Sequence, residues 1–264
     1  MHCAQVTWDI DDININNIDK NKLKYIIKIR NKTKGGKFKQ IYEGNEKKIL
    51  IENLSLSTNY EILIYSIYEF LISPVIYKSF NSFSIDSDIL EESGRKEEFL
   101  EKIYEWHNYS NLDLLYRGTR DGTSSEVFHE KCDDKGPTLC LYKNDVGNIF
   151  GGYAAISWKK NGGTQSAKDS FIFTLTNIFD IEPTKFSDKN TNKNVHHVSN
   201  YGPSFGEHNS DISIYEDFLK IDSYSNFPEQ YYDTIGRGKS IFTGDTDSSK
   251  KEFRIKEIEV FKVS

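Results

Sequence analysis

The sequence has 264 residues, of which 37% are hydrophobic and 28% charged, with a formal net charge of −6 at pH 7. This is the composition of one large or two ordinary globular domains. Residues 1–85 contain 12 basic and 9 acidic side chains, whereas the rest of the chain contains 22 and 31. Because contacts to phosphates need clustered Lys and Arg, the acidic excess disfavours nucleic acid as a partner and favours a basic protein surface.

The apolar runs are too short for a membrane helix, which needs roughly 18 residues, so we expect no membrane insertion. The longest run, residues 60–77, is interrupted by Glu61, Glu69 and Pro74. The N-terminus lacks the pattern of a signal peptide, and the three cysteines are scattered, as is typical of a reducing compartment. These features predict a cytoplasmic protein without a disulfide framework.

Residues 1–83 have the pattern of an all-β domain. Alternating or β-branched stretches predict strands at residues 6–10, 24–32, 38–44, 48–54, 59–68 and 74–80. Short strands at regular spacing with polar turns predict a β-sandwich.

The stretch LSLSTNY (54–60) has the pattern of a tyrosine corner, in which a Tyr that enters a strand hydrogen-bonds to the backbone of the preceding turn. With Trp8 early in the chain, this segment resembles a fibronectin type III domain. Trp8 belongs to the second strand of that family, so we expect the first strand to be short or missing.

A helix from about residue 94 to 107 is expected to open the second domain, residues 84–264. Phe99, Leu100, Ile103 and Trp106 recur at helical spacing, and Ser93 is the candidate cap. Further on, the pattern predicts a helix at 123–132 and strands at 113–118, 137–144, 147–158, 170–177, 196–206, 211–217 and 253–263. Residues 159–169 and 220–250 are expected to be loops.

Cys132 and His129 lie three residues apart on the predicted helix, so their side chains could touch. A catalytic cysteine also needs a lowered pKa and an oriented base, which no motif here indicates. We therefore expect Cys132 to be a small buried hydrophobe and His129 a residue of the helix surface. Ser124 and Ser125 lie outside any nucleophile elbow, and Thr123 or Ser124 fits better as a helix cap.

The metal and phosphate patterns are weak. Adjacent histidines in a strand, such as His196 and His197, point to opposite faces and make a poor ligand pair with His208. The acidic run 245–252 lacks the spacing of a calcium loop, and GRGKS (236–240) lacks the Walker spacing. We expect neither a metal nor a cofactor.

Several glycines indicate backbone geometry. Asp121–Gly122 is expected to end a strand in a turn, and Gly136–Pro137 to separate a helix from the next strand. Gly151–Gly152 lies inside a predicted strand, which indicates a bulge or a close backbone approach.

Taken in order, the block LLYRGTRDGTSSEVFHEKCDDKGPTLCLYKNDVGNIFGGYAAISW (114–158) resembles the start of a TLDc domain. Later blocks agree, namely DSFIFTLTN (169–177), YGPSFGEHNSDISI (201–214), SYSNFP (223–228), IFTGD (241–245) and FRIKEIEVFKV (253–263). The resemblance covers about residues 85–264 and looks closest to divergent protist forms. The family's characteristic positions are Arg120, Asp121, Gly122, Gly136, Pro137, Gly151, Gly152, Glu257 and Glu259.

The resemblance implies a mainly β (α+β) fold, in which a β-sandwich is flanked by helices. It also implies a class without an established catalytic mechanism, linked to oxidation resistance and to binding of the vacuolar-type proton pump. We expect Arg120 and Asp121 to pair with the acidic last strand.

Three functional hypotheses remain open. The first is a non-enzymatic interaction or regulatory protein with protein partners, such as the vacuolar-type pump. The second is a structural component of a cytoskeletal or axonemal assembly, and the third is a thiol-dependent redox enzyme that uses Cys132.

Overall fold

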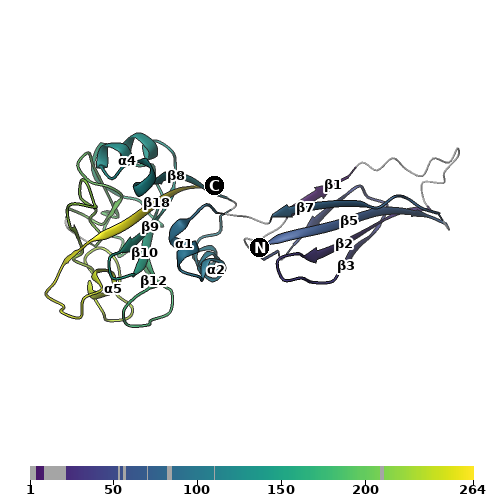
Figure 1. Cartoon of the computed structure of the whole chain (residues 1–264). Coiled ribbons are helices and arrows are strands. Elements are labelled where there is room, and N and C mark those ends of the chain that lie inside the picture. The colour runs from purple at the N-terminus through teal and green to yellow at the C-terminus, as the bar shows by residue number, and fades with distance from the viewer. Residues whose placement is uncertain are drawn as a thin grey trace. The chain divides into compact units, whose positions relative to one another are not determined.

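The computed structural model describes residues 4–8, 22–52, 54–55, 58–69, 71–81, 85–109, 111–208 and 211–264. The chain divides into two compact units, Met1–Ser84 and Ile85–Ser264 (Figure 1). Both are dominated by antiparallel strands, and the helices of the described residues belong to the second unit.

The first unit is built from β1 (Ala4–Thr7), β2 (Leu23–Asn31), β3 (Lys39–Gly44), β4 (Lys48–Ile51), β5 (Asn59–Tyr68), β6 (Leu71–Ile72) and β7 (Ile76–Asn81). Strand β1 pairs with β4, while a second sheet has the order β3-β2-β5, with β6 and β7 on the other edge of β5. Along β5, buried residues alternate with more exposed ones, as the sequence predicts. Ile51 of β4 and Ile27 of β2 belong to the same core, so the two sheets share it.

The tyrosine-corner contact is present. The backbone N–H of Ser55 donates to Tyr60 Oη over 2.9 Å. Trp8 is buried and meets the rings of Tyr25 and Tyr42 edge to face, each at 5.8 Å between centroids. The expectation about a missing first strand falls on residues 1–3, outside the described residues, as do positions 9–10 of the first expected strand.

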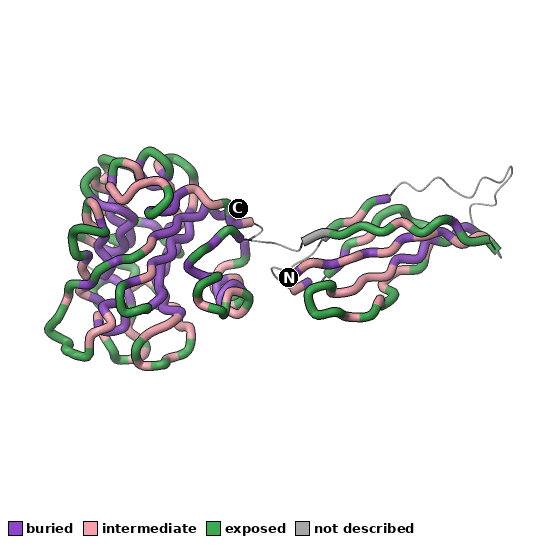
Figure 2. The backbone as a smooth tube through the Cα atoms, in the orientation of Figure 1, coloured by how far each residue is buried: buried purple, intermediate pink, exposed green. Residues whose placement is uncertain are grey.

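The second unit is organised by a six-stranded antiparallel sheet in the order β13-β12-β10-β9-β18-β8. Its strands are β8 (Leu112–Arg117), β9 (Thr138–Asn144), β10 (Ile149–Ala154), β12 (Phe171–Thr176), β13 (Thr184–Ser187) and β18 (Ile255–Val263). The last strand, β18, lies between β8 and β9, so the end of the chain completes the centre of the sheet. Figure 2 shows that these strands are largely buried.

The register of the sheet separates two rows of side chains, one on each face. One row belongs to the main core of the unit and runs through Tyr116, Val260, Cys140, Gly152, Ile172 and Phe186. The other row runs through Arg117, Glu259, Leu141, Gly151, Phe173 and Lys185. Because side chains alternate along a strand, the sequence determines both rows once the register is fixed.

The main core lies between this sheet and shorter elements. These are β11 (Asn161–Gln165), β14 (Val195–Val198) and β15 (Ser204–Phe205) in one sheet, and β16 (Ser223–Tyr224) with β17 (Glu252–Phe253) in another. Two expected loops therefore contain structure, since β11 lies within 159–169 and β16 within 220–250. The strand expected at 211–217 consists only of isolated bridges, for example Phe205 with Ile212.

Five helices complete the described part of the second unit: α1 (Asp88–Glu92), α2 (Lys96–Trp106), α3 (Gly118–Asp121), α4 (Ser125–Cys132) and α5 (Ser240–Thr243). The helix predicted at 94–107 is present as α2, and a short helix that was not predicted, α1, precedes it; Gly94, which has a φ of 67°, lies between the two. Ser93 was expected to start α2, but its hydroxyl donates to Leu90 O and closes α1. Ser87 caps α1, and the predicted cap of α4 is confirmed, because Ser124 Oγ accepts from Val127 N.

Helices α1 and α2 lie along the second face of the sheet (Figure 1). Phe99, Leu100 and Ile103 of α2 are buried, and the Trp106 ring lies 5.5 Å from that of Phe173. This spacing of apolar residues positions the end of α2 over the strands β12 and β10.

The paired glycines of β10 explain how closely the layers pack. A Cβ at Gly151 would lie 2.1 Å from Cys140 O, and one at Gly152 would lie 2.5 Å from the Phe205 ring. The predicted close backbone approach is therefore confirmed at Gly151, where it comes from the neighbouring strand β9, whereas Gly152 makes room for a ring of the opposite layer. The turn expected at Asp121–Gly122 differs, because β8 ends at Arg117 and α3 intervenes before Gly122.

Candidate functional site

Glu259 and Arg117 form a buried ion pair where α1 begins. Glu259 of β18 is completely buried and accepts Arg117 Nε at 2.8 Å. It also accepts the backbone N–H of Asp88 at 2.7 Å and the hydroxyl of Ser87. The carboxylate therefore occupies the N-terminal end of α1, where it provides acceptors for the start of the helix.

Arg117 has further acidic partners. Its Nη2 atom lies 3.0 Å from Asp86 Oδ1, and Nη1 lies 3.1 Å from Asp88 Oδ2. Burial raises the pKa of Glu259, although hydrogen bonds from Ser87, Asp88 and Arg117 act in the opposite direction. We call Asp86, Ser87, Asp88, Arg117 and Glu259 the α1 clasp, because they join α1 to strands β8 and β18.

The pairing expected between Arg120 and the last strand is wrong. Arg120 is half-exposed on α3 and pairs with the neighbouring Asp121 at 2.7 Å. Asp121 in turn accepts the backbone N–H of Arg117 at 2.9 Å. Arg117 is the arginine that reaches the last strand, because it lies opposite Glu259 in the register of β8 and β18.

Glu257 lies next to this cluster. Its carboxylate accepts the backbone N–H of Thr119 at 3.1 Å and the Thr119 hydroxyl. A shallow hollow of about 280 Å³ lies here, lined by Asp88, Ile89, Glu92, Thr119, Lys143, Lys256 and Glu257. The structure thus gathers Arg120, Asp121, Glu257 and Glu259 around α1 and α3.

The remaining predicted positions have roles in the fold. Gly122 and Gly136 have φ values of 127° and 91°, which favour glycine. The N–H of Gly136 donates to Ser157 Oγ, and Pro137 O accepts the N–H of Val263. Gly151 and Gly152 lie in β10, where they allow the close packing described above.

The Cys132 region has the geometry of a core. Cys132 and Cys140 are both buried free cysteines, and burial raises the pKa of each thiol. His129, expected on the helix surface, is also buried and lies with Nδ1 2.7 Å from Asp133 Oδ1 and Nε2 3.1 Å from Val198 O. Cys132 therefore lies where a thiolate is disfavoured.

The adjacent histidines of β14 point to different surroundings, as the strand period predicts. The His196 ring lies 5.8 Å from that of His208, whereas the His197 ring lies 5.3 Å from that of Trp158. Among the described residues, no three His, Cys, Asp or Glu side chains come together as metal ligands.

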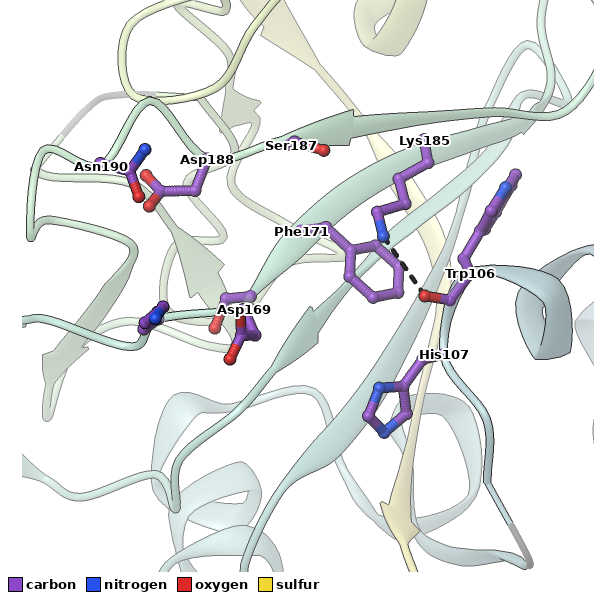
Figure 3. Close-up of a pocket in the computed structure, with 10 residues that line it drawn as sticks. Trp106, His107, Asp169, Phe171, Lys185, Ser187, Asp188 and Asn190 are labelled. Carbon is purple, nitrogen blue, oxygen red and sulfur yellow. Dashed lines mark hydrogen bonds between the residues drawn. The ribbon is translucent and has the colours of Figure 1, made fainter.

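A second hollow, of about 320 Å³, was missed by the sequence reasoning (Figure 3). It is lined by Trp106, His107, Lys168, Asp169, Ser170, Phe171, Lys185, Ser187, Asp188 and Asn190. We call it the Trp106 hollow. Its residues come from three distant segments, so no local motif could have indicated it.

The comparisons with known proteins agree with the block pattern of the sequence. A search of curated proteins gave no match. In the described residues, the helices are all too short or too polar to cross a membrane. The family model of the TLDc domain matches residues 83–264, which is more than half of the chain. The chain therefore belongs to the TLDc domain family.

Proposed function

We propose that this chain is a non-enzymatic interaction protein in which the TLDc domain provides a rigid recognition surface. The observation that supports this most directly is the use of the family's characteristic residues. Glu259 anchors α1, Gly151 allows close pairing with β9, Gly152 allows two layers to pack, and Gly136 supplies a left-handed turn. These residues shape the body of the domain, and function then belongs to its outer surface.

The thiol-enzyme hypothesis has less support. A nucleophilic cysteine needs access and a stabilised thiolate, but Cys132 is fully buried and its pKa is raised. His129, its nearest candidate base in the sequence, lies against Asp133 and Val198 O instead.

The first unit is proposed to be a fibronectin type III-like β-sandwich that adds a second docking surface. The Ser55–Tyr60 hydrogen bond and the core shared by two sheets support this reading. Leu71, Ile72 and Tyr77 are large apolar side chains that remain exposed near one edge of its larger sheet, where a partner could cover them.

The partner that we propose is the vacuolar-type proton pump, in line with the resemblance to the TLDc family and its link to oxidation resistance. The acidic excess of the second unit favours a basic surface on that partner. The alternative is a cytoskeletal or axonemal assembly. Both partners are consistent with the proposed cytoplasmic location.

Affinity purification of the tagged full-length chain from its native cell tests this function. We expect pump subunits to co-elute and to cross-link mainly to residues 85–264. Recovery of filament proteins would favour the assembly, and recovery of the chain as a lone monomer at low salt would refute an interaction function. Low salt is needed because contacts between exposed charges are screened at high ionic strength.

A further inference from the structure

The Trp106 hollow lies beside β12 and β13 and combines aromatic walls with opposite charges (Figure 3). Trp106 and Phe171 meet edge to face at 6.4 Å, and His107 stacks on Tyr153 at 4.1 Å. Burial and the nearby charge of Lys185 lower the pKa of His107, which favours the neutral form of this imidazole. The walls therefore offer flat, uncharged ring surfaces.

The cation at one end of the hollow already has partners within the domain. Lys185 Nζ donates to the backbone carbonyl of Trp106 at 3.2 Å and lies 4.5 Å from the centre of the Phe171 ring (Figure 3). These contacts hold Lys185 in place. Its ammonium group is thus used to fix the end of α2 to β13.

At the other end of the hollow, the Asp188 carboxylate, unlike Lys185, is not fully paired within the described part of the domain. The Oδ1 atom of Asp188 is buried and has no hydrogen-bond partner among the described residues. Asp188 as a whole is only partly buried and lines the hollow, so the accessible part of this carboxylate favours a ligand that brings a donor. Asp169 lines the same side of the hollow and has a φ of 72°, a left-handed conformation that Asp tolerates better than most residues.

We propose that the Trp106 hollow is a binding site for an arginine side chain presented by a partner protein. In this arrangement the guanidinium faces Asp188 and Asp169, and the apolar part of the side chain lies against Phe171 and Trp106. Arginine fits better than lysine, because its planar group stacks on rings and binds a carboxylate through two donors. The proposal rests on the interaction function proposed above and names the chemistry that one of its surfaces recognises.

Lys168 also lines the hollow and, like Lys185, carries a charge that opposes such a ligand. It is exposed and would repel an incoming guanidinium. Removal of the Asp188 charge should therefore weaken binding of an arginine side chain, and removal of the Lys168 charge should strengthen it.

The test uses the full-length chain labelled with ¹⁵N, in which each of the three tryptophans gives one indole N–H signal. The probes are Nα-acetyl-arginine N-methylamide and its neutral citrulline counterpart. We expect the Trp106 signal to move and saturate with the arginine probe, and the citrulline probe to bind at least tenfold more weakly. Trp158 is an internal control, since its indole donates to Thr138 inside the core.

Three variants complete the test. Asp188→Asn is expected to weaken binding of the arginine probe by about 10- to 100-fold, the range for a hydrogen bond to a charged group. Lys168→Met is expected to tighten it by up to about fivefold, as for an exposed charge pair. Asp222→Asn removes an exposed carboxylate elsewhere and is expected to leave binding unchanged.

A Trp106 signal that stays fixed, or that responds equally to both probes or equally in Asp188→Asn, would overturn the proposal. A Trp158 signal at the same position as in the unsubstituted chain shows that each variant is folded. If the arginine probe does not bind while the full-length chain still captures its partner, only the arginine site is refuted. If the probe binds as expected and no partner is captured, only the proposed function is refuted.

Discussion

The α1 clasp gives the sharpest prediction for stability, through the variant Glu259→Gln. Glu259 is fully buried and accepts hydrogen bonds from Arg117, Ser87 and the N–H of Asp88. The substitution preserves the shape of the side chain but leaves Arg117 without its buried counter-charge. Breaking a buried ion pair on one side costs about 3–5 kcal/mol.

The remaining partners of Arg117 place the expected cost at the lower end. Asp86 and Asp88 stay within 3.0 and 3.1 Å of the guanidinium, but their side chains are 68% and 58% exposed, so water screens them. We therefore expect a loss of about 3 kcal/mol in the free energy of unfolding. For a unit of this size, that corresponds to a decrease in Tm of roughly 6–12 °C.

The assay is urea unfolding followed by tryptophan fluorescence in a Trp8→Phe background. The two remaining tryptophans, Trp106 and Trp158, then report on the second unit alone. Asp222→Asn, which breaks the exposed pair with Arg254, is the matched control and should cost less than about 1 kcal/mol.

The double variant Arg117→Met/Glu259→Leu separates the cost of an unpaired buried charge from the cost of the lost hydrogen bonds. It removes both charges, leaves the Asp88 N–H and the Ser87 hydroxyl without their acceptor and removes the Arg117 donor from the Asp86 carbonyl, a loss of about 1–3 kcal/mol. The double variant should therefore be no less stable than Glu259→Gln. A loss of less than about 1 kcal/mol in the free energy of unfolding for Glu259→Gln would refute this reasoning. So would a double variant whose loss equals the sum of the losses in Arg117→Met and Glu259→Leu alone.

Three other predictions address the core. Gly152→Ala should lower the free energy of unfolding in urea by about 1–3 kcal/mol, because the new methyl would meet the Phe205 ring. Gly151→Ala should lower it more, because its methyl would meet the rigid backbone at Cys140 O. Unchanged unfolding midpoints would contradict this packing. Burial lowers the pKa of His197 to about 4, below the ordinary value of 6.5, so stability should be full above pH 6.5 and should fall by up to about 3 kcal/mol towards pH 4. His197→Leu should flatten that decline between the two pH values, and an unaltered slope would exclude His197 as its source. Cys132 and Cys140 should resist a thiol reagent at pH 8 in the native chain and react once urea unfolds it, as peptide mass mapping would show; rapid labelling of either of these two thiols in the native chain would contradict their burial.

Much of the fold follows from local pattern. The strand β5 has the bounds that its alternation predicts, and Ser124 caps α4 where a small polar residue precedes the helix. The glycine pair of β10 was identified as a close approach because glycine inside a strand has few other reasons to be there.

The parts that were missed depend on distant contacts or short elements. Strand β11 contains Gly162 and Gly163, and glycines hide a strand from its propensity. A Cβ at Gly162 would lie 3.0 Å from His197 Cβ, so a neighbouring strand explains that glycine and its own sequence does not. Helix α5 has four residues, too few to show a period.

The residues of the candidate sites were predictable where a local pattern marks them, and not where strand register decides. Glu257 and Glu259 were identified through the family resemblance, but the choice between Arg117 and Arg120 depends on the register of β8 against β18. One residue lies in a strand facing Glu259, and the other lies three residues later on an exposed helix. Register is a property of the assembled sheet, which a single sequence does not display.

The most direct test of the interaction function compares partner capture by the full-length chain and by its Cys132→Ala variant. Because the buried thiol has only a packing role, both chains should recover the same partners in the same ratio from cell extract. A chain that elutes alone in both cases, or a Cys132→Ala variant that stays folded but no longer captures the partners, would contradict the account.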